Sequence, residues 1–210
     1  MKKLLLLPIL ALSLAACDED KTDDYPPMVT EMAVMESDAS GSISRFTTDG
    51  GRTLSLVTPY TDVTPGALWR FLIGYVLERD GRATIYSLER VVVVRDSTAL
   101  ADVRHDPVGF VSAWTGGRFV NLHLTPKTKG GTQTWGYVRE GDYTNLQGGT
   151  TYRVALHHRQ GSDQPAYSAE TYVSLPVDSI NARASAADSI QLTLATFAGQ
   201  RTVTLPCVAQ

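Results

Sequence analysis

A single cysteine near the amino end offers the clearest chemistry in this 210-residue sequence. Cys17 closes the run Leu14-Ala15-Ala16-Cys17, which follows Met1-Lys2-Lys3 and a short apolar stretch from Leu4 to Leu14. A basic start, a short apolar run and small residues before the cleavage point are typical of an exported bacterial lipoprotein. We therefore expect residues 1–16 to be a removed signal peptide and Cys17 to be lipidated, with palmitate among its acyl chains. An ordinary secretory signal with an incidental cysteine is the alternative.

Residues 17–27 form the predicted tether between the lipid and the folded part. The segment from Asp18 to Asp24 holds five acidic residues and one lysine, and Pro26 and Pro27 follow it. So charged a segment cannot build a core and should be extended. Acidic residues directly after a lipidated cysteine resemble the surface-export signal of Bacteroidetes-type lipoproteins. We expect anchoring at the outer membrane, on the cell surface rather than on its periplasmic face, with the lipid as the membrane contact.

Other residues with catalytic potential are scattered along the chain. Adjacent residues on a strand point to opposite faces, so His157 and His158 cannot both bind one metal without a bulge. Nucleophile, phosphate-binding and dinucleotide motifs are absent from the sequence. We expect a protein that is not an enzyme and has no catalytic residues, no metal site and no cofactor. A carboxylate pair assembled from distant strands, as in glycoside hydrolases, is the alternative that the sequence leaves open.

An aromatic segment is the candidate for ligand binding. Trp135 and Tyr137 share one face of a predicted strand, and Tyr143 follows them among glycine, threonine and asparagine residues. Flat aromatic rings beside amide and carboxylate groups can stack against sugars or hold a peptide. We therefore select these three residues as the candidate site for a glycan or protein partner. The alternative is that Trp135 and Tyr137 fill a core.

The charge balance argues against a nucleic-acid partner. The net charge of the chain is −3, and residues 28–95 and 96–210 carry −1 and 0 respectively. Neither region has the basic surface that binding to phosphates requires.

Strand signals dominate residues 28–96, which we predict to be a small five-stranded closed barrel. Asp49-Gly50-Gly51 and Asp80-Gly81 are turn signals between runs of alternating polarity. Closure into a barrel would remove exposed strand edges. The predicted strands are Val29–Met35, Ser42–Phe46, Arg52–Val57, Trp69–Arg79 and Ala83–Val94.

Residues 97–210 are again rich in strand signals, and we predict a β-sandwich there, so the fold class is all-β. Gly116-Gly117 should join a hairpin that directs Val120, Leu122 and Leu124 to the core. Residues 176–187 should form a loop or a short helix. The predicted strands are Val108–Trp114, Arg118–Leu124, Thr132–Arg139, Thr151–His158, Ala166–Leu175, Ser189–Thr196 and Arg201–Leu205.

Three segments carry a resemblance to a known family. They are Asp106-Pro107-Val108, the hairpin from Val111 to Leu122, and the run Ala187-Asp188-Ser189-Ile190-Gln191-Leu192-Thr193-Leu194. With the lipoprotein signal and acidic tether, the chain resembles the NigD-like lipoproteins, which pair an OB-type domain with a β-sandwich. The resemblance implies a lipid-anchored binding or accessory module of unknown specific function. Because the family name comes from an operon linked to bacteriocin production, the alternative is a bacteriocin-associated accessory or immunity lipoprotein.

Overall fold

The computed structural model describes residues 27–208, and almost all of their regular structure is β-strand. The predictions about the signal peptide, Cys17 and the acidic tether up to Pro26 lie outside these residues. The one helix of the described part, α1 (Asp178–Asn181), is a single turn within the segment predicted to be a loop or short helix. No helix within residues 27–208 has the length and apolar character to cross a membrane.

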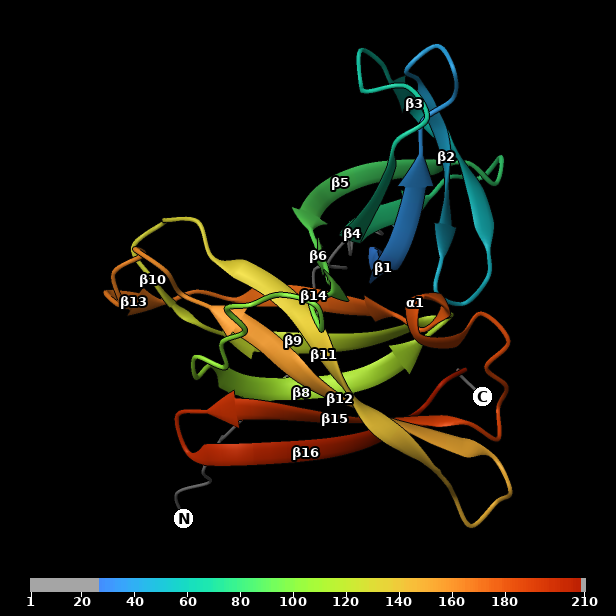
Figure 1. Cartoon of the computed structure of the whole chain (residues 1–210). Coiled ribbons are helices and arrows are strands. Elements are labelled where there is room, and N and C mark those ends of the chain that lie inside the picture. The colour runs from blue at the N-terminus through green and yellow to red at the C-terminus, as the bar shows by residue number, and fades with distance from the viewer. Residues whose placement is uncertain (1–26, 209–210) are drawn as a thin grey trace, which may run out of the picture.

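The first part of the chain is a closed five-stranded barrel with strand order β1-β2-β3-β5-β4 (Figure 1), which confirms the predicted barrel. Strands β4 and β5 form the predicted hairpin, although β5 ends at Arg90 rather than Val94. The barrel core contains eight buried hydrophobic residues, among which Phe46 and Tyr75 meet edge to face with ring centroids 5.2 Å apart. The barrel strands are β1 (Val29–Glu36), β2 (Ile43–Thr48), β3 (Thr53–Tyr60), β4 (Leu68–Leu77) and β5 (Ala83–Arg90).

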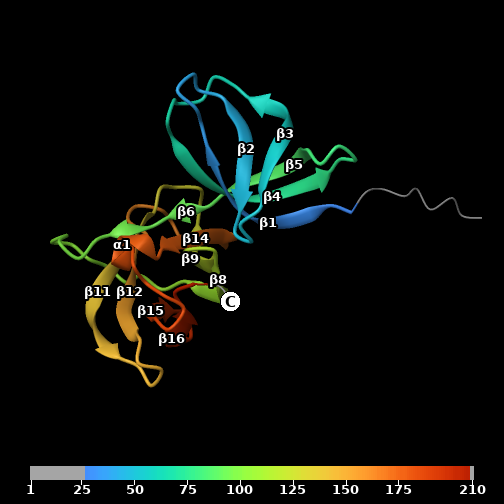
Figure 2. The same ribbon diagram turned by 90° about the vertical axis from the view of Figure 1, so that its right-hand side faces the viewer.

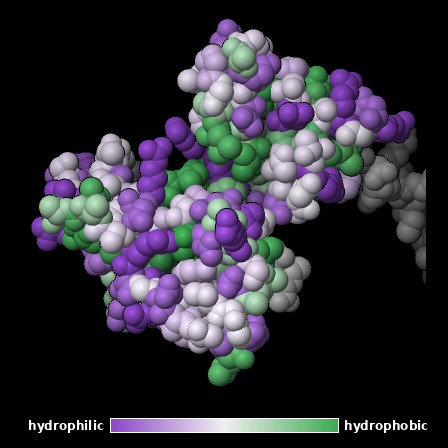
Figure 3. Space-filling model, turned by 45° about the vertical axis from the view of Figure 1, so that its right-hand side comes forward, coloured by the Kyte–Doolittle hydropathy of each residue, from purple (hydrophilic) through white to green (hydrophobic). Residues whose placement is uncertain are grey.

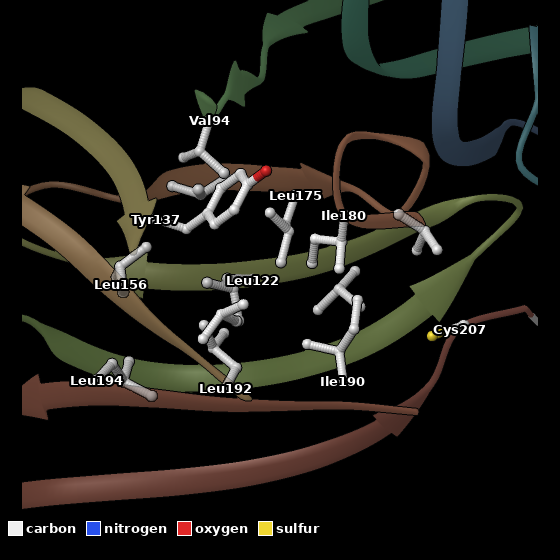
Figure 4. Close-up of a cluster of buried hydrophobic side chains, with 14 of the residues drawn as sticks. Val94, Leu122, Tyr137, Leu156, Leu175, Ile180, Ile190, Leu192, Leu194 and Cys207 are labelled. Carbon is white, nitrogen blue, oxygen red and sulfur yellow. The ribbon is translucent and has the colours of Figure 1, made fainter. Parts of the chain in front are cut away.

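The second part is the predicted β-sandwich. One sheet has the order β16-β15-β12-β11-β7 and the other the order β6-β14-β9-β8, while β10 and β13 form a separate pair. The two sheets enclose a core of seventeen buried residues, drawn in part in Figure 4. The strands are β6 (Val92–Val93), β7 (Arg95–Asp96), β8 (Gly109–Gly116), β9 (Phe119–Thr125), β10 (Lys127–Thr128), β11 (Thr134–Thr144), β12 (Thr150–Arg159), β13 (Tyr167–Ser168), β14 (Thr171–Pro176), β15 (Ser189–Thr196) and β16 (Gly199–Pro206).

The chain leaves the barrel earlier than the expected division into 28–96 and 97–210. Strand β6 pairs in parallel with β14, and β7 pairs in parallel with β11, so both belong to the sandwich. Each sheet of the sandwich thus receives one short strand from the segment that directly follows Arg90. Within the valine-rich run, Val91 and Val94 are buried, whereas Val93 is 39% exposed.

A buried arginine joins the barrel to the outer face of the β6-β14-β9-β8 sheet, where the two parts meet in Figure 2. In β4, Nε of Arg70 donates to Oγ of Ser174 at 2.8 Å. Its Nη2 donates to Oδ2 of Asp49 at 2.6 Å and to Oδ1 of Asn121 at 3.0 Å. The guanidinium also lies over the ring of Phe119, 3.7 Å from its centroid. Most of the polar groups at the junction therefore satisfy one another.

This junction explains why β9 is buried on both faces near its middle. Val120, Leu122 and Leu124 face the core as predicted, with at most 1% of their surface exposed. Asn121 on the opposite face is also fully buried, because the barrel covers it.

Candidate functional site

The structure separates the three aromatic residues selected from the sequence. Tyr137 is fully buried in the sandwich core, and its hydroxyl donates to Ser179, 3.0 Å from Oγ. Trp135 lies on the same strand, packs against that core and stacks on His158 with ring centroids 4.1 Å apart. Tyr137 is therefore a core residue, whereas Trp135 is partly buried at the edge of that core. Tyr143, beyond a bulge in β11 between Arg139 and Gly141, is 46% exposed.

Tyr143 lies in a groove of about 640 Å³ beside the end of the β11–β12 hairpin, here named the hairpin groove. Leu146 forms the tip of the hairpin and is fully exposed, in contrast to the leucines of the core. The hairpin extends beyond the body of the sandwich (Figure 1), and hydrophobic surface lies at its end (Figure 3). The groove is lined by Tyr143, Thr144, Asn145, Leu146, Gln147, Thr151, Ala186, Ala187, Asp188, Ser189, Thr204, Leu205 and Pro206.

The turn that carries Leu146 is rigidly built around Asn145. Oδ1 of Asn145 accepts hydrogen bonds from the backbone N–H groups of Gln147 and Gly149, both at 3.0 Å. Its Nδ2 donates to the carbonyl of Ala187 at 2.8 Å, which ties the hairpin to the loop before β15. A side-chain amide bonded to its own turn is a frequent means of ordering such loops. Leu146 is therefore held in solvent by an ordered turn.

Asp188 holds the other wall of the groove. Its Oδ1 accepts from the backbone N–H of Thr150 at 2.6 Å, and its Oδ2 accepts from the backbone N–H and the hydroxyl of Ser185 at 2.7 and 2.9 Å. Hydrogen bonds from Ser185 and Thr150 hold the pKa of the Asp188 carboxyl below its usual range. The carboxylate is thus committed to the structure of the wall.

Close packing brings the two walls together at Gly149. A Cβ at this position would lie 2.1 Å from the carbonyl oxygen of Ala187, so a glycine is required for the approach. Next to it, the hydroxyls of Thr151 and Ser189 bond each other at 2.7 Å.

The hairpin groove is suited to apolar contacts more than to proton transfer. Four of its polar side chains, those of Asn145, Thr151, Asp188 and Ser189, are occupied by internal hydrogen bonds. The surface left for a ligand includes Leu146 and Tyr143. Exposed apolar surface beside a concavity is typical of interaction sites.

The histidines of the sandwich have structural contacts. Nδ1 of His157 accepts from the backbone N–H of Arg104 at 2.9 Å, and Nδ1 of His158 lies 2.9 Å from the carbonyl of Asp106. Burial lowers the pKa of the His158 imidazole. Across residues 27–208, no group of three or more His, Cys, Asp and Glu side chains is arranged to hold a metal ion.

The sequence interpretation missed Leu146 and the whole junction at Arg70. Leu146 stands between two polar residues in a glycine-containing turn, and an isolated leucine there is a weak signal of exposure. Arg70 stands in an otherwise apolar strand between Trp69 and Phe71. A charged residue in an apolar strand indicates that the outer face of the strand meets polar partners, but it does not identify those partners on the sandwich.

Comparison with known proteins gives a family for this architecture. Residues 91–207 match the model of the NigD-like C-terminal beta sandwich domain. No functionally curated protein matches the chain.

Several solved structures resemble the chain over most of its length. A NigD-like immunity protein from Bacteroides caccae is 25% identical, with a TM-score of 0.64 over 86% of this chain and 93% of that chain. A proposed toxin-related protein from Parabacteroides distasonis is 13% identical, with a TM-score of 0.66 over 85% and 92%. A proposed lipoprotein from Bacteroides fragilis is 12% identical, with a TM-score of 0.63 over 88% and 99%.

At the lower identities the likeness concerns the fold alone, whereas the family match rests on the sequence and covers more than half of the chain. The two-part architecture and the sequence match agree, and the chain belongs to the family defined by the NigD-like C-terminal beta sandwich domain.

Proposed function

We propose that this protein is a non-catalytic binding module, held at the outer membrane surface by lipid on Cys17, and that its hairpin groove contacts a protein partner. The observation that carries the proposal is the fully exposed Leu146, held by an ordered turn beside an apolar groove. The ordered turn keeps this large aliphatic side chain in place beside the groove, where a partner can cover it. Covering it stabilises a complex because its apolar surface is removed from water.

A protein fits this groove better than a glycan does. Sugars are recognised through hydrogen bonds to side-chain amides and carboxylates as well as by stacking on aromatic rings. Here the amide of Asn145 and the carboxylate of Asp188 are already bonded within the protein. Among the other lining residues, Tyr143 and Leu146 can fit an apolar side chain of a partner.

The proposal is tested by site-specific cross-linking on living cells. A photoreactive phenylalanine analogue replaces Leu146 and, in a second strain, Phe197, which lies at the β15–β16 turn and is 52% exposed. Both positions are exposed hairpin tips of the same sandwich, so the second is a matched control. We expect a defined protein adduct from position 146 that is absent from position 197. Equal adducts from both positions, or none from 146, would contradict a binding role for the groove.

Localisation is tested separately by treating intact cells with protease and probing for the folded part. Digestion, with a periplasmic control protein left intact, is expected for the cell surface. Protection would place the protein on the periplasmic side and would leave the groove proposal standing.

A second function is an accessory or immunity role toward a bacteriocin. It is favoured by the similarity over most of both chains to the Bacteroides caccae protein described as a NigD-like immunity protein. Deletion of the gene should then increase sensitivity to bacteriocins of related strains, and the intact gene should restore resistance. Unchanged sensitivity across a panel of producers would reject this role.

A further inference from the structure

The barrel is closed by a very short contact between β3 and β5. These parallel strands are paired only at Leu56 and Ala83, whereas β4 pairs with β5 from Leu77 to Phe71. Beyond Ala83, the two strands border a cleft of about 180 Å³. We name this region the seam, formed by residues 57–60 of β3 and 84–90 of β5.

Strand β5 presents a free main-chain edge at the seam. Between Thr84 and Arg90 its pairing within the described residues is with β4 alone, so the opposite edge has no strand partner. Residues 86–90 are all exposed. Tyr86 is an extra, bulged residue of this strand, so the regular part of the free edge runs from Ser87 to Arg90. It offers N–H and C=O groups at the spacing of a strand, which an extended polypeptide matches.

The two sides of the seam are not equivalent. On β3, Pro59 lacks a backbone N–H and so weakens that strand as a template for a ladder. The β5 side from Thr84 to Leu88 has neither proline nor glycine, and its residues favour strands. An incoming segment would therefore pair with β5.

Side chains on β5 indicate what kind of segment would fit. Ile85 and Leu88 stand opposite the core residues Tyr75 and Ile73, so they belong to the inner row of the barrel. Leu88 is nevertheless 38% exposed, because no strand covers it at the seam. Apolar side chains of an added strand would cover this inner row.

The outer row of β5 contributes charge. Glu89 stands opposite Leu72 and is exposed, so a lysine or arginine on the outer side of an added strand would pair with it. Tyr86, the unpaired residue at the register shift, is 66% exposed.

We propose that the free edge of β5 accepts an extended, amphipathic segment of a partner polypeptide as an added strand, with apolar residues facing the barrel and a basic residue near Glu89. This mode of recognition draws its affinity from main-chain hydrogen bonds and its specificity from alternate side chains. The seam lies in the barrel and the hairpin groove in the sandwich, so the two proposals stand independently.

The test selects peptides from a phage-displayed library of about twelve residues, a length that exceeds an average strand, on the unlipidated mature chain from Asp18 to Gln210. Enriched peptides are then measured on Leu88→Lys, on Leu146→Lys as a probe of the hairpin groove, and on Leu100→Lys as the control, because Leu100 is 53% exposed and lies outside both proposed sites. All three variants put a lysine in place of an exposed leucine, so they are matched for charge and chemistry. We expect binding to fall about tenfold or more with Leu88→Lys, because a buried charge would then face the added strand. Leu100→Lys should leave it unchanged.

Hydrogen exchange gives a second measurement on the wild-type chain. Bound peptide should slow exchange of the backbone amides within residues 84–90. If Leu88→Lys lowers the melting temperature, Tyr86→Lys replaces it, since this side chain lies further in solvent. Loss of binding with Leu146→Lys alone would assign the peptides to the hairpin groove and overturn the seam proposal. Equal binding to Leu88→Lys and Leu100→Lys, or a selection that yields no peptide, would overturn it as well.

Discussion

The barrel and the sandwich reach a stable fold by different means. The sandwich encloses seventeen buried core residues between two sheets, whereas the barrel has eight. The barrel is closed by a single residue pair, and it rests its outer wall on the sandwich through Arg70. Small domains bury a smaller fraction of their surface and are correspondingly less stable. The comparison indicates that the barrel depends on the sandwich more than the sandwich depends on the barrel.

The largest expected effect comes from removing the arginine that joins the two parts. Arg70→Ala leaves Asp49 without its charged partner, and loss of one member of a buried pair costs about 3–5 kcal/mol of unfolding free energy. We expect the barrel of this variant to unfold at a lower temperature than the sandwich. Calorimetry should therefore resolve two thermal transitions.

Arg82→Ala is the matched control, since the Arg82–Asp80 pair is half exposed and should contribute less than about 1 kcal/mol. A single cooperative transition in Arg70→Ala, with stability close to that of this control, would show that the barrel does not need the junction.

Substitution of one buried tyrosine in each part compares the stability of the two cores directly. Tyr75 in the barrel and Tyr137 in the sandwich are both fully buried. Either Tyr→Ala variant should lower the free energy of unfolding by about 3–5 kcal/mol. Tyr137→Phe removes only the hydrogen bonds to Ser179 and should lower it by about 1 kcal/mol. Chemical denaturation measures all three. If the barrel is the weaker part, Tyr75→Ala should unfold it alone, and global unfolding by Tyr75→Ala would argue against that view.

The next effect is confined to one end of the sandwich. Gly149→Ala forces a Cβ against the carbonyl of Ala187 and should cost about 2 kcal/mol through overpacking. At Gly148, where φ is +79° and nothing crowds a Cβ, alanine should cost only about 1 kcal/mol. Gly149→Ala should also weaken cross-linking from position 146, because it shifts the hairpin groove. Equal behaviour of the two variants would mean that the wall contact is unimportant.

Titration of Asp188 should give a smaller, pH-dependent effect. Its pKa is lowered in the folded protein, so its stabilisation is complete above the pKa of the unfolded chain, about 3.9, and is lost as pH falls through the lower folded value. Asp188→Asn should be less stable than wild type at pH 7, and the difference should shrink below about pH 4. Thermal melts across this range measure it. A difference that grows toward acid would contradict the assigned hydrogen bonds.

The smallest signal, thiol reactivity, reports on the sandwich alone. Cys207 is fully buried, and burial raises the pKa of its thiol to about 11. It should therefore resist alkylation at pH 8 until the sandwich opens. In Arg70→Ala, Cys207 should stay protected through the first transition and react in the second. Reaction in the first transition would mean that the sandwich, not the barrel, unfolds first.

Most strands were predictable because their side chains alternate with a period of two and their turns contain glycine. The hairpin across Gly116-Gly117 and the closing pair β15–β16 are confirmed for this reason. The change of sheet after Arg90 was harder to place, because β6 and β7 are two residues each and carry no period of their own. Of the three aromatic residues selected from the sequence, only Tyr143 lies in the candidate site. Alternation along a strand separates two faces but does not say which face another layer will cover.

The sequence by itself determined that residues 28–208 are rich in strands, that a barrel-like region precedes a sandwich, and that neither region carries the charge of a nucleic-acid binder. These properties follow from local alternation, turn residues and composition, which act over a few positions. Only the tertiary structure decided that Tyr137 belongs to the core and that Leu146 is presented to solvent. It also decided that Arg70 is buried and bonds Ser174, which lies 104 positions further along the sequence. Contacts of such separation depend on how the two parts meet, and no local pattern encodes that arrangement.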